Sequence, residues 1–537
     1  MDVNVMYLVQ FSNGHYISIY TPGSCYYCRT KKKKRKQLAL ANLISDHHSI
    51  SWSIHRQPRR RLAADSLRMT TASPSPSPVR EVSRRTVTPP PRPRERIPLT
   101  AWDLSLLSAD YIQKGLLFPP PPFSSTVGLV DHLEAALAGA LATYYPVAGR
   151  LAVDQHRDDA GHVVGCSVSV DCAGQGAEIV HAVADGLAVA DVVVPDAVVP
   201  SVVRSFFPLD HAVNYDGHEL PLFVAQVTEL ADGVFVAFVY NHALSDGTAF
   251  WDFLNAWAEA ARSRLAAPPR APATPRTPVF ERWSADGGAA PPLVLPFADL
   301  AGLIDRSVPP PHCERMLHFS AESLAALKER ARQELVAAGD TAGAAAVTRF
   351  QALSSLLWRC FTRARRPAPE QEVVFRATAN NRGRLLPALP AAYFGNAVSA
   401  VSPAPVRAAE LLARGHGWAA AAVGRAVAAH TDAGIRGRAA AWAARPEVAA
   451  FRVFDPNLVL ISSSPRFDMY GCDFGWGKAA AARSGKANKY DGKVSLFPGR
   501  EGGGSVDAEV VLTPEHMAAL EVDDELWAAV TPDAPRQ

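Results

Sequence analysis

The sequence predicts an α/β protein in two halves, and three observations support this fold class. The chain has 537 residues, which is more than one hydrophobic core usually serves, so two domains are expected. Runs with strand character and stretches of helical period occur on both sides of the middle of the chain. Between them, residues 266–311 are rich in Pro-Pro and Gly-Gly pairs and are too long for an ordinary loop, so we interpret them as a crossover.

The N-terminal residues differ from the rest of the chain. Residues 1–68 show little amphipathic period and contain Cys25-x-x-Cys28 and a basic run at 31–36. Read functionally, these are half of a zinc site and a nuclear localisation signal, but no second Cys/His pair lies nearby to complete four metal ligands. We therefore interpret residues 1–68 as a disordered extension, or as translated sequence upstream of a start at Met69.

A tether and the two domains follow this extension. Residues 69–98 are rich in Ser, Pro and Arg, which predicts a flexible tether. The N-terminal domain is expected over 99–265 and the C-terminal domain over 312–537, with the crossover between them.

The N-terminal domain combines helices and strands. Leucines at helical spacing predict a helix over 129–141, and an apolar stripe predicts another over 248–263. The run at 234–240 is almost continuously apolar, which is typical of a buried strand. Strands are predicted over 163–170, 221–228 and 234–240.

The C-terminal domain has the same mixture. Helical patterns cover 321–338 and 345–363, and strand patterns cover 372–377 and 506–511. Both halves are therefore predicted to be α/β.

Composition excludes several classes of protein. Hydrophobic residues make up 48% and charged residues 20% of the chain, and the net charge is only +3. Much of the excess of Lys and Arg lies near the N-terminus, so the rest of the chain shows no basic region of the kind that binds nucleic acid. The seven cysteines are scattered, which indicates free thiols in a reducing compartment. No apolar run approaches the ~20 residues that span a membrane, and no secretory signal is visible, so we expect a cytoplasmic protein without a membrane span.

The strongest chemical signal is His242-x-x-x-Asp246 at the end of the predicted buried strand. A strand end can hold a side chain rigidly and still present it to a cleft. Histidine suits proton abstraction near neutral pH. Gly247 directly afterwards is expected to permit a sharp turn into the helix.

The same spacing recurs at His181-x-x-x-Asp185, which is also followed by a glycine. This copy follows a much shorter apolar run and is predicted to lie in a loop-like stretch. Spacing alone cannot choose between the two, because such short patterns often arise by chance. The longer predicted buried strand that precedes His242 favours it over His181 as the catalytic residue.

Together with a second motif, this pattern resembles the plant BAHD acyltransferases. That motif is Asp473-Phe474-Gly475-Trp476-Gly477, and it lies in the family's order and at roughly its separation from His242. The resemblance covers about residues 80–530. Supporting segments are 145–150, 381–384 and 393–396, and a subgroup with acetyltransferase-like, cuticle-related and defence-related members shares 99–103, 111–118 and 463–467.

The resemblance implies a fold and an activity. The fold is a monomer of two similar chloramphenicol-acetyltransferase-like α/β domains, each a mixed sheet with flanking helices, with an active-site channel between them. The activity is transfer of an acyl group from an acyl-CoA co-substrate to a small-molecule alcohol or amine, with no metal and no bound cofactor. His242 would act as general base in a direct transfer through a tetrahedral intermediate.

The resemblance also implies roles for other residues. Asp246 would pair with Arg382 and hold the loop of His242 rather than act as a base. In the second motif, Asp473 and its two glycines are expected to form a fixed turn that supports the site, and Trp476 to pack in the core or line the channel. These supporting residues are Asp473, Gly475, Trp476 and Gly477. The neighbouring Cys472 has no adjacent base and is expected to be a packing residue.

Two groups of residues are candidates for binding substrates. Ser462 and Ser464 stand where many family members have Thr and Trp, so Ser462 still offers an oxyanion donor while Ser464 removes a pocket wall. Arg483, Lys486 and Lys489 are candidate partners for CoA phosphates, with solvated surface charge as the alternative. The acyl group, the acceptor and the choice between O- and N-acylation stay open. A lyase or a binding protein on the same fold is the alternative function, and the presence of His242 argues against both.

Overall fold

The computed structural model describes residues 6–10, 16–20, 78–193, 198–266, 276–285, 292–448 and 455–532. The chain divides into two units, Met1–Pro74 and Ser75–Gln537. In the first unit, strand β1 (Met6–Gln10) pairs antiparallel with β2 (Tyr16–Tyr20), so these two segments of the predicted disordered extension form a two-stranded sheet. The Cys25-x-x-Cys28 motif and the basic run at 31–36 lie outside the described residues.

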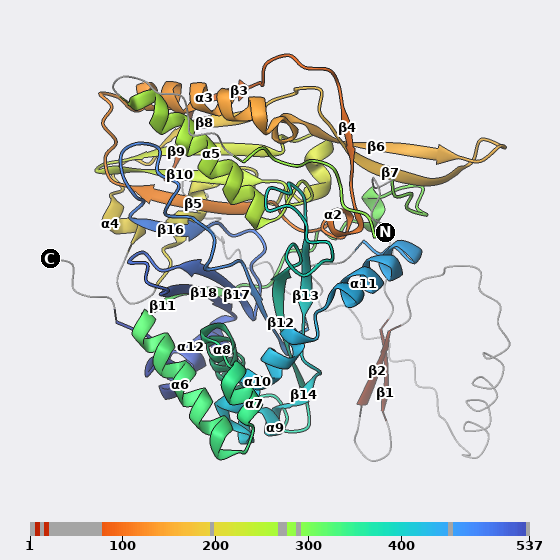
Figure 1. The fold of residues 1–537 in the computed structure, drawn as a ribbon, viewed down its shortest axis with the longest axis vertical. Helices are drawn as coiled ribbons and strands as arrows, with labels where there is room; N and C mark the ends of the chain where they lie inside the picture. Colours follow the sequence, from red (N-terminus) through yellow and green to blue (C-terminus); the bar gives the residue numbers. More distant parts are fainter. Residues whose placement is uncertain are drawn as a thin grey trace, which may run out of the picture. The chain divides into compact units, whose positions relative to one another are not determined.

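The second unit contains two large mixed sheets (Figure 1). The N-terminal half builds a six-stranded sheet in which β8 and β9 are parallel and the other neighbours are antiparallel. In spatial order its strands are β16 (Ala481–Ser484), β5 (Ile112–Phe118), β10 (Gly233–Tyr240), β9 (Phe223–Leu230), β8 (Ala177–Val183) and β3 (Arg80–Val87). A smaller sheet beside it contains β4 (Arg96–Pro98), β7 (Val163–Asp171) and β6 (Arg150–Arg157).

The C-terminal half builds the second large sheet, in which β17, β15 and β12 are parallel neighbours. Its strands are β11 (Cys313–Phe319), β18 (Val506–Leu512), β17 (Lys493–Pro498), β15 (Leu458–Ser462), β12 (Glu372–Asn380) and β13 (Val398–Val401), with β14 (Val406–Arg407) paired to β12. The two-domain architecture with mixed sheets agrees with the fold class that the sequence predicts.

Helices cover the sheets and supply the cores. In the N-terminal half, α3 (Thr126–Thr143) and α5 (Gly247–Leu265) lie side by side and pack their apolar faces on β10, whose eight residues are all buried. The shorter elements of this half are α2 (Ala101–Leu104), α4 (Val189–Val192) and the 3-10 turns η1 (Tyr145–Ala148), η2 (Ser201–Phe206) and η3 (Asn214–His218). The residues of η2 pack on the opposite face of the same sheet. Burial of both faces explains the continuous apolar character of β10.

In the C-terminal half, α8 (Arg349–Arg365) is the central helix of the core. The helix begins with a capping box, in which Thr348 and Gln351 exchange side-chain to backbone hydrogen bonds. Nearly all of its residues are buried. Around it lie α6 (Ala321–Ala337), α7 (Thr341–Ala346), α9 (Ala408–Ala413), α10 (Gly415–Ala428), α12 (Pro514–Leu520) and α13 (Asp524–Trp527), while α11 (Asp432–Ala444) packs near α2.

The structure corrects two predicted domain boundaries. The predicted tether over 69–98 is wrong for β3 and β4, which are paired strands. β3 is a polar edge strand, held by its backbone ladder and by ion pairs such as Arg84 with Glu178, so its sequence lacks an apolar signal. The second correction is β16, which comes from the predicted C-terminal domain over 312–537 but completes the N-terminal sheet beside β5. At four residues, it is too short for a pattern to reveal.

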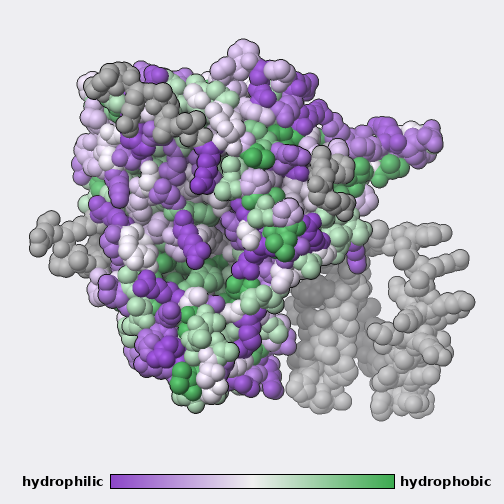
Figure 2. Space-filling view, viewed as in Figure 1, coloured by the Kyte–Doolittle hydropathy of each residue, from purple (hydrophilic) through white to green (hydrophobic). Residues whose placement is uncertain are grey.

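The described parts of the crossover, 276–285 and 292–311, contain one short 3-10 turn, η4 (Ala301–Leu303), and otherwise no regular helix. Arg282 within it is 4% exposed and donates hydrogen bonds to the carbonyl oxygens of Leu244 (2.9 Å) and Phe394 (2.8 Å). The crossover therefore fastens the loop after β10 to the C-terminal half. On the face shown in Figure 2, hydrophilic and apolar residues are mixed, and the projecting β6–β7 hairpin is mainly hydrophilic.

Candidate active site

His242 lies in the short loop between β10 and α5 and lines a cavity of about 1680 Å³. Residues from both halves line this cavity, among them Lys114 and Trp251 from the N-terminal half and Arg376, Ser462 and Lys493 from the C-terminal half. A cavity shared by two domains is a common position for a small-molecule site.

The backbone of His242 is clamped on both sides. Its N–H donates to Oδ1 of Asn214 at 2.7 Å, and its carbonyl oxygen accepts from Nδ2 of Asn396 at 2.8 Å. Both asparagines are fully buried, and Asn396 also donates to Oδ1 of Asp103 at 2.8 Å. The sequence patterns predict none of these three residues as part of the site, although Asp103 and Asn396 lie in segments that carry the family resemblance.

The environment of the imidazole favours its neutral form. Burial lowers the pKa of His242 below its usual value, and the charge of Lys493 acts in the same direction. The carboxylate of Asp246 and the side chain of Asn396 act in the opposite direction but do not cancel the effect of burial. Nδ1 is buried and has no hydrogen-bond partner among the described residues. A neutral imidazole facing a cavity can accept a proton at neutral pH.

Asp246 and Arg382 form a buried ion pair, as expected. The guanidinium donates two hydrogen bonds to the carboxylate, at 2.7 and 3.0 Å, and one each to the carbonyl oxygens of Tyr393 and Gly395. The carboxylate also accepts from the N–H of Ala397 and caps the N-terminus of α5. Because both oxygens of Asp246 are occupied, its geometry is that of a structural anchor rather than of a base.

Gly247 is required for a reason other than the predicted turn. Its backbone does not adopt positive φ. A Cβ at this position would instead lie 2.7 Å from the ring of Phe467, so a glycine is needed for close packing between α5 and the loop after β15.

The loop 473–477 is a fixed turn that does not line the cavity. Oδ1 of Asp473 accepts from the N–H groups of Gly475 (2.8 Å) and Gly477 (2.9 Å), and both glycines have positive φ. Phe474 is fully buried in the N-terminal core, and Trp476 stacks on it at 5.6 Å between ring centroids. This arrangement matches the structural interpretation of Asp473 and the core position of Trp476.

Of the candidate substrate-binding residues, Ser462 and Ser464 do line the cavity with His242. The three candidate cations, Arg483, Lys486 and Lys489, are not simply solvated surface charges. Lys486 pairs with Asp210, and Arg483 is 7% exposed in β16, so neither lines the cavity. Lys489 lines it but is 4% exposed and forms ion pairs with Glu314 and with Glu509. Its charge is therefore matched inside the protein, which argues against a phosphate contact.

The second HxxxD copy is remote from the cavity. His181 lies within β8, not in a loop as predicted, and its Nε2 is 3.6 Å from Oε2 of Glu229. It does not line the cavity. Cys472 is also outside it: burial raises the pKa of its thiol, and Sγ donates to the carbonyl oxygen of Leu254, which suits a packing residue.

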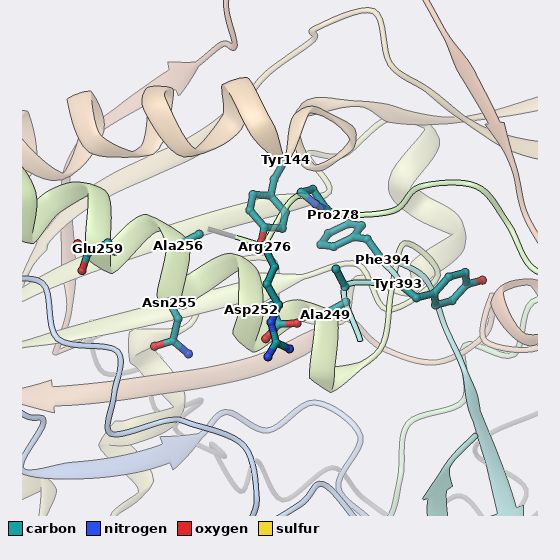
Figure 3. Close-up of a pocket in the computed structure, with 11 residues that line it drawn as sticks. Tyr144, Ala249, Asp252, Asn255, Ala256, Glu259, Arg276, Pro278, Tyr393 and Phe394 are labelled. Atoms are coloured by element: carbon teal, nitrogen blue, oxygen red, sulfur yellow. The ribbon is translucent and has the colours of Figure 1, made fainter. Parts of the chain in front are cut away.

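A second pocket, of about 300 Å³, lies against another face of α5. Figure 3 shows Asp252, Asn255 and Glu259 on successive turns of that helix, with the rings of Tyr144 and Phe394 near the Asp252 end of this row. His242 is not among its lining residues, so this pocket is distinct from the cavity of the histidine loop.

Within the described ranges, no helix is long and apolar enough to cross a membrane. The same ranges hold no group of three or more His, Cys, Asp or Glu side chains placed to bind a metal.

Comparison with known proteins places the chain in a family. Residues 78–527 match the family described as "Transferase family". The chain is 32% identical over 441 residues to an uncharacterised acetyltransferase of Arabidopsis thaliana, which covers 80% of this chain and 94% of the relative. It is 31% identical over 442 residues to the BAHD acyltransferase DCR of the same plant, covering 80% and 87%. In fold it resembles TRI101 of F. graminearum, solved with coenzyme A and deoxynivalenol, with a TM-score of 0.59 at 18% identity over 81% of this chain and 98% of that one. With these matches and a histidine loop at a cavity between two α/β halves, the chain belongs to the plant BAHD acyltransferase family.

Proposed function

We propose that this protein is an acyl-CoA-dependent O- or N-acyltransferase in which His242 is the general base. The observation that supports it best is the state of His242. Its main chain is clamped by Asn214 and Asn396, burial lowers its pKa, and its side chain lines the cavity between the halves. Asp246, the other titratable group of the motif, is already saturated by Arg382.

The chemistry is a direct transfer. Nε2 of His242 takes the proton of the acceptor hydroxyl or amine as that atom attacks the thioester carbonyl. The tetrahedral oxyanion then collapses, the C–S bond breaks, and the imidazolium returns the proton to the departing thiolate. Ser462 and Ser464 line the same cavity, and Ser462 is our candidate donor to the oxyanion.

Acyl-CoA is the proposed donor because TRI101, which shares this fold, was solved with coenzyme A. The exposed cations that line the cavity are better candidates for its phosphates than Lys489. Among these exposed cations, our candidates are Arg349, Arg376 and Arg466. No residue in this scheme binds a metal or a resident cofactor.

We further propose that the enzyme acts as a monomer in the cytoplasm. A single chain supplies both walls of the cavity and both clamps of His242. The five described cysteines are all free thiols, which suits a reducing compartment.

The test is thiol release by the purified protein from a panel of acyl-CoAs, with small alcohols and amines as acceptors. His242→Ala should lower kcat by about 10²–10⁴-fold, the usual contribution of a general base. His181→Ala is the matched control, because it has the same sequence spacing but lies outside the cavity. Equal losses in the two folded variants would refute the assignment.

A further inference from the structure

Two lysine side chains face the cavity from opposite halves of the molecule. Lys114 lies on β5 and Lys493 on β17, and both line the cavity that contains His242. Along β17 the side chains alternate: Val494 and Leu496 pack in the C-terminal core, so Lys493 points the other way. The two ammonium groups therefore converge on one space.

Among the described residues, the close contacts of both ammonium groups are with aromatic rings rather than with paired carboxylates. Nζ of Lys114 is 4.2 Å from the ring centroid of Phe497, and Nζ of Lys493 is 5.4 Å from that of Tyr490. In the part of the chain that the structure describes, neither lysine forms an ion pair with Asp or Glu, because no carboxylate oxygen lies within 4.0 Å of either Nζ.

The two carboxylates beside the neighbouring Lys489 are already engaged. Glu314 pairs with Lys489 and with Arg204, and Glu509 pairs with Lys489 and accepts from the hydroxyl of Ser484. These contacts match the charges of Glu314 and Glu509, so Lys114 and Lys493 remain as excess positive charge at the cavity wall.

Burial makes this arrangement unfavourable in the absence of an anion. It lowers the pKa of Lys114 to about 8, an effect that Lys489 strengthens and Glu509 opposes. It lowers the pKa of Lys493 to about 7, and the charge of Lys114 adds to that shift. Both ammonium groups lose part of their hydration, and their like charges repel each other. A bound anion would remove both costs.

We propose that Lys114 and Lys493 form a carboxylate-binding subsite, so that one of the two substrates of the proposed acyl transfer carries a carboxylate near its reacting end. A phosphate of CoA is the less suitable occupant. Lys493 is close enough to His242 for its charge to affect the imidazole, and the pantetheine arm separates the thioester from the phosphates of CoA. The carboxylate belongs either to the acceptor or to the far end of the acyl group.

Equilibrium binding tests this inference without requiring turnover. Succinyl-CoA and butyryl-CoA have acyl chains of equal length and differ in a terminal carboxylate, so their calorimetric Kd values test the acyl end. For the acceptor end, 3-hydroxybenzoate, 4-hydroxyphenylacetate and 6-hydroxyhexanoate are each compared with their methyl esters. In at least one arm, we expect the acid to bind the wild type at least tenfold more tightly than its neutral partner.

Substitution of the two lysines tests whether they cause this acid preference. Lys114→Met combined with Lys493→Met should abolish the acid preference. The double substitution should not lower the melting temperature, because it removes two half-buried charges that repel each other. Lys328→Met is the control, since Lys328 lines the same cavity but is exposed on α6, and it should keep the preference. Absence of any acid preference in the wild type, or its survival in the double variant, would overturn the subsite. Thiol release from neutral acyl-CoAs is scored separately, so failure of the subsite leaves the proposed acyltransferase activity standing.

Discussion

Replacing Asp246 by Asn isolates the charge of the buried ion pair from its shape. In the structure, Oδ1 accepts from Arg382 at 3.0 Å and from the N–H groups of Thr248 and Ala249 at 3.1 and 3.3 Å. Oδ2 accepts from Arg382 at 2.7 Å and from the N–H of Ala397 at 2.9 Å. The amide retains one of these oxygens, but it turns an NH₂ group toward other donors and leaves the guanidinium unneutralised.

The expected cost follows from this geometry. Removing one partner of a buried ion pair typically costs about 3–5 kcal/mol, because the remaining charge is left uncompensated. Arg382 keeps its hydrogen bonds to the carbonyl oxygens of Tyr393 (2.9 Å) and Gly395 (3.1 Å), which places the expectation near ~3 kcal/mol. For a domain of about 150–250 residues, that corresponds to a drop of about 6–12 °C in Tm. Because Asp246 anchors the loop of His242, kcat should fall as well.

Thermal melting of Asp246→Asn, Arg382→Leu and the double variant measures the effect. Glu329→Gln is the control, because Glu329 forms a solvent-exposed ion pair with Arg332 and its loss should leave the melting temperature almost unchanged. The double variant should be less destabilised than the sum of the single variants, since each single change leaves a charge unpaired. Strict additivity, or an Asp246→Asn variant as stable as the control, would refute the reasoning.

The further predictions concern the pH profile of His242, the packing of Gly247 and the N-terminal residues. The acid limb of kcat/KM should have its midpoint below the usual histidine value of about 6.5, because the basic form of His242 is lost only as pH falls through its lowered pKa. Lys493→Met should move that midpoint upward, because it removes a positive charge that lowers the pKa. Gly247→Ala should destabilise the protein by about 1–3 kcal/mol, because the added methyl group overpacks against Phe467. Adding Phe467→Ala to the same variant should recover part of this loss. A chain beginning at Met69 should be as stable and active as the full chain, whereas one lacking β3 and β4 should melt at a lower temperature.

Each of these has a contrary outcome. A pH profile with an acid midpoint above that of free histidine would contradict the buried neutral imidazole. An alanine at position 247 that costs nothing would show that the Phe467 ring moves freely. Loss of activity on truncation at Met69 would show that residues before it contribute to the working enzyme.

The elements that could be predicted from sequence are those whose pattern is local. The helices near 129–141 and 248–263 and the strand near 234–240 bury apolar residues at regular spacing, so their own residues reveal them. β3 and β16 could not be predicted because each depends on a partner far away in the chain, β8 and β5 respectively. Their residues carry too little apolar pattern to be recognised alone.

The candidate site divides in a similar way. Asp246 and Arg382 could be paired through the family resemblance, and the structure contains that ion pair. Asn214 could not be found, because a single asparagine in a 3-10 turn has no motif and its contact with His242 arises only after folding. Lys489 is predicted as a phosphate contact from its charge alone, because the sequence does not reveal its buried partners Glu314 and Glu509.

The position of β16 has a consequence for biosynthesis. Since this strand pairs with β5, the N-terminal sheet lacks its outer neighbour until residues 481–484 have left the ribosome. Until then the nascent chain displays the unpaired backbone edge of β5, which another polypeptide can occupy. We therefore expect that a fragment ending at the crossover aggregates when it is expressed alone and is rescued when the remainder of the chain is supplied in the same cell.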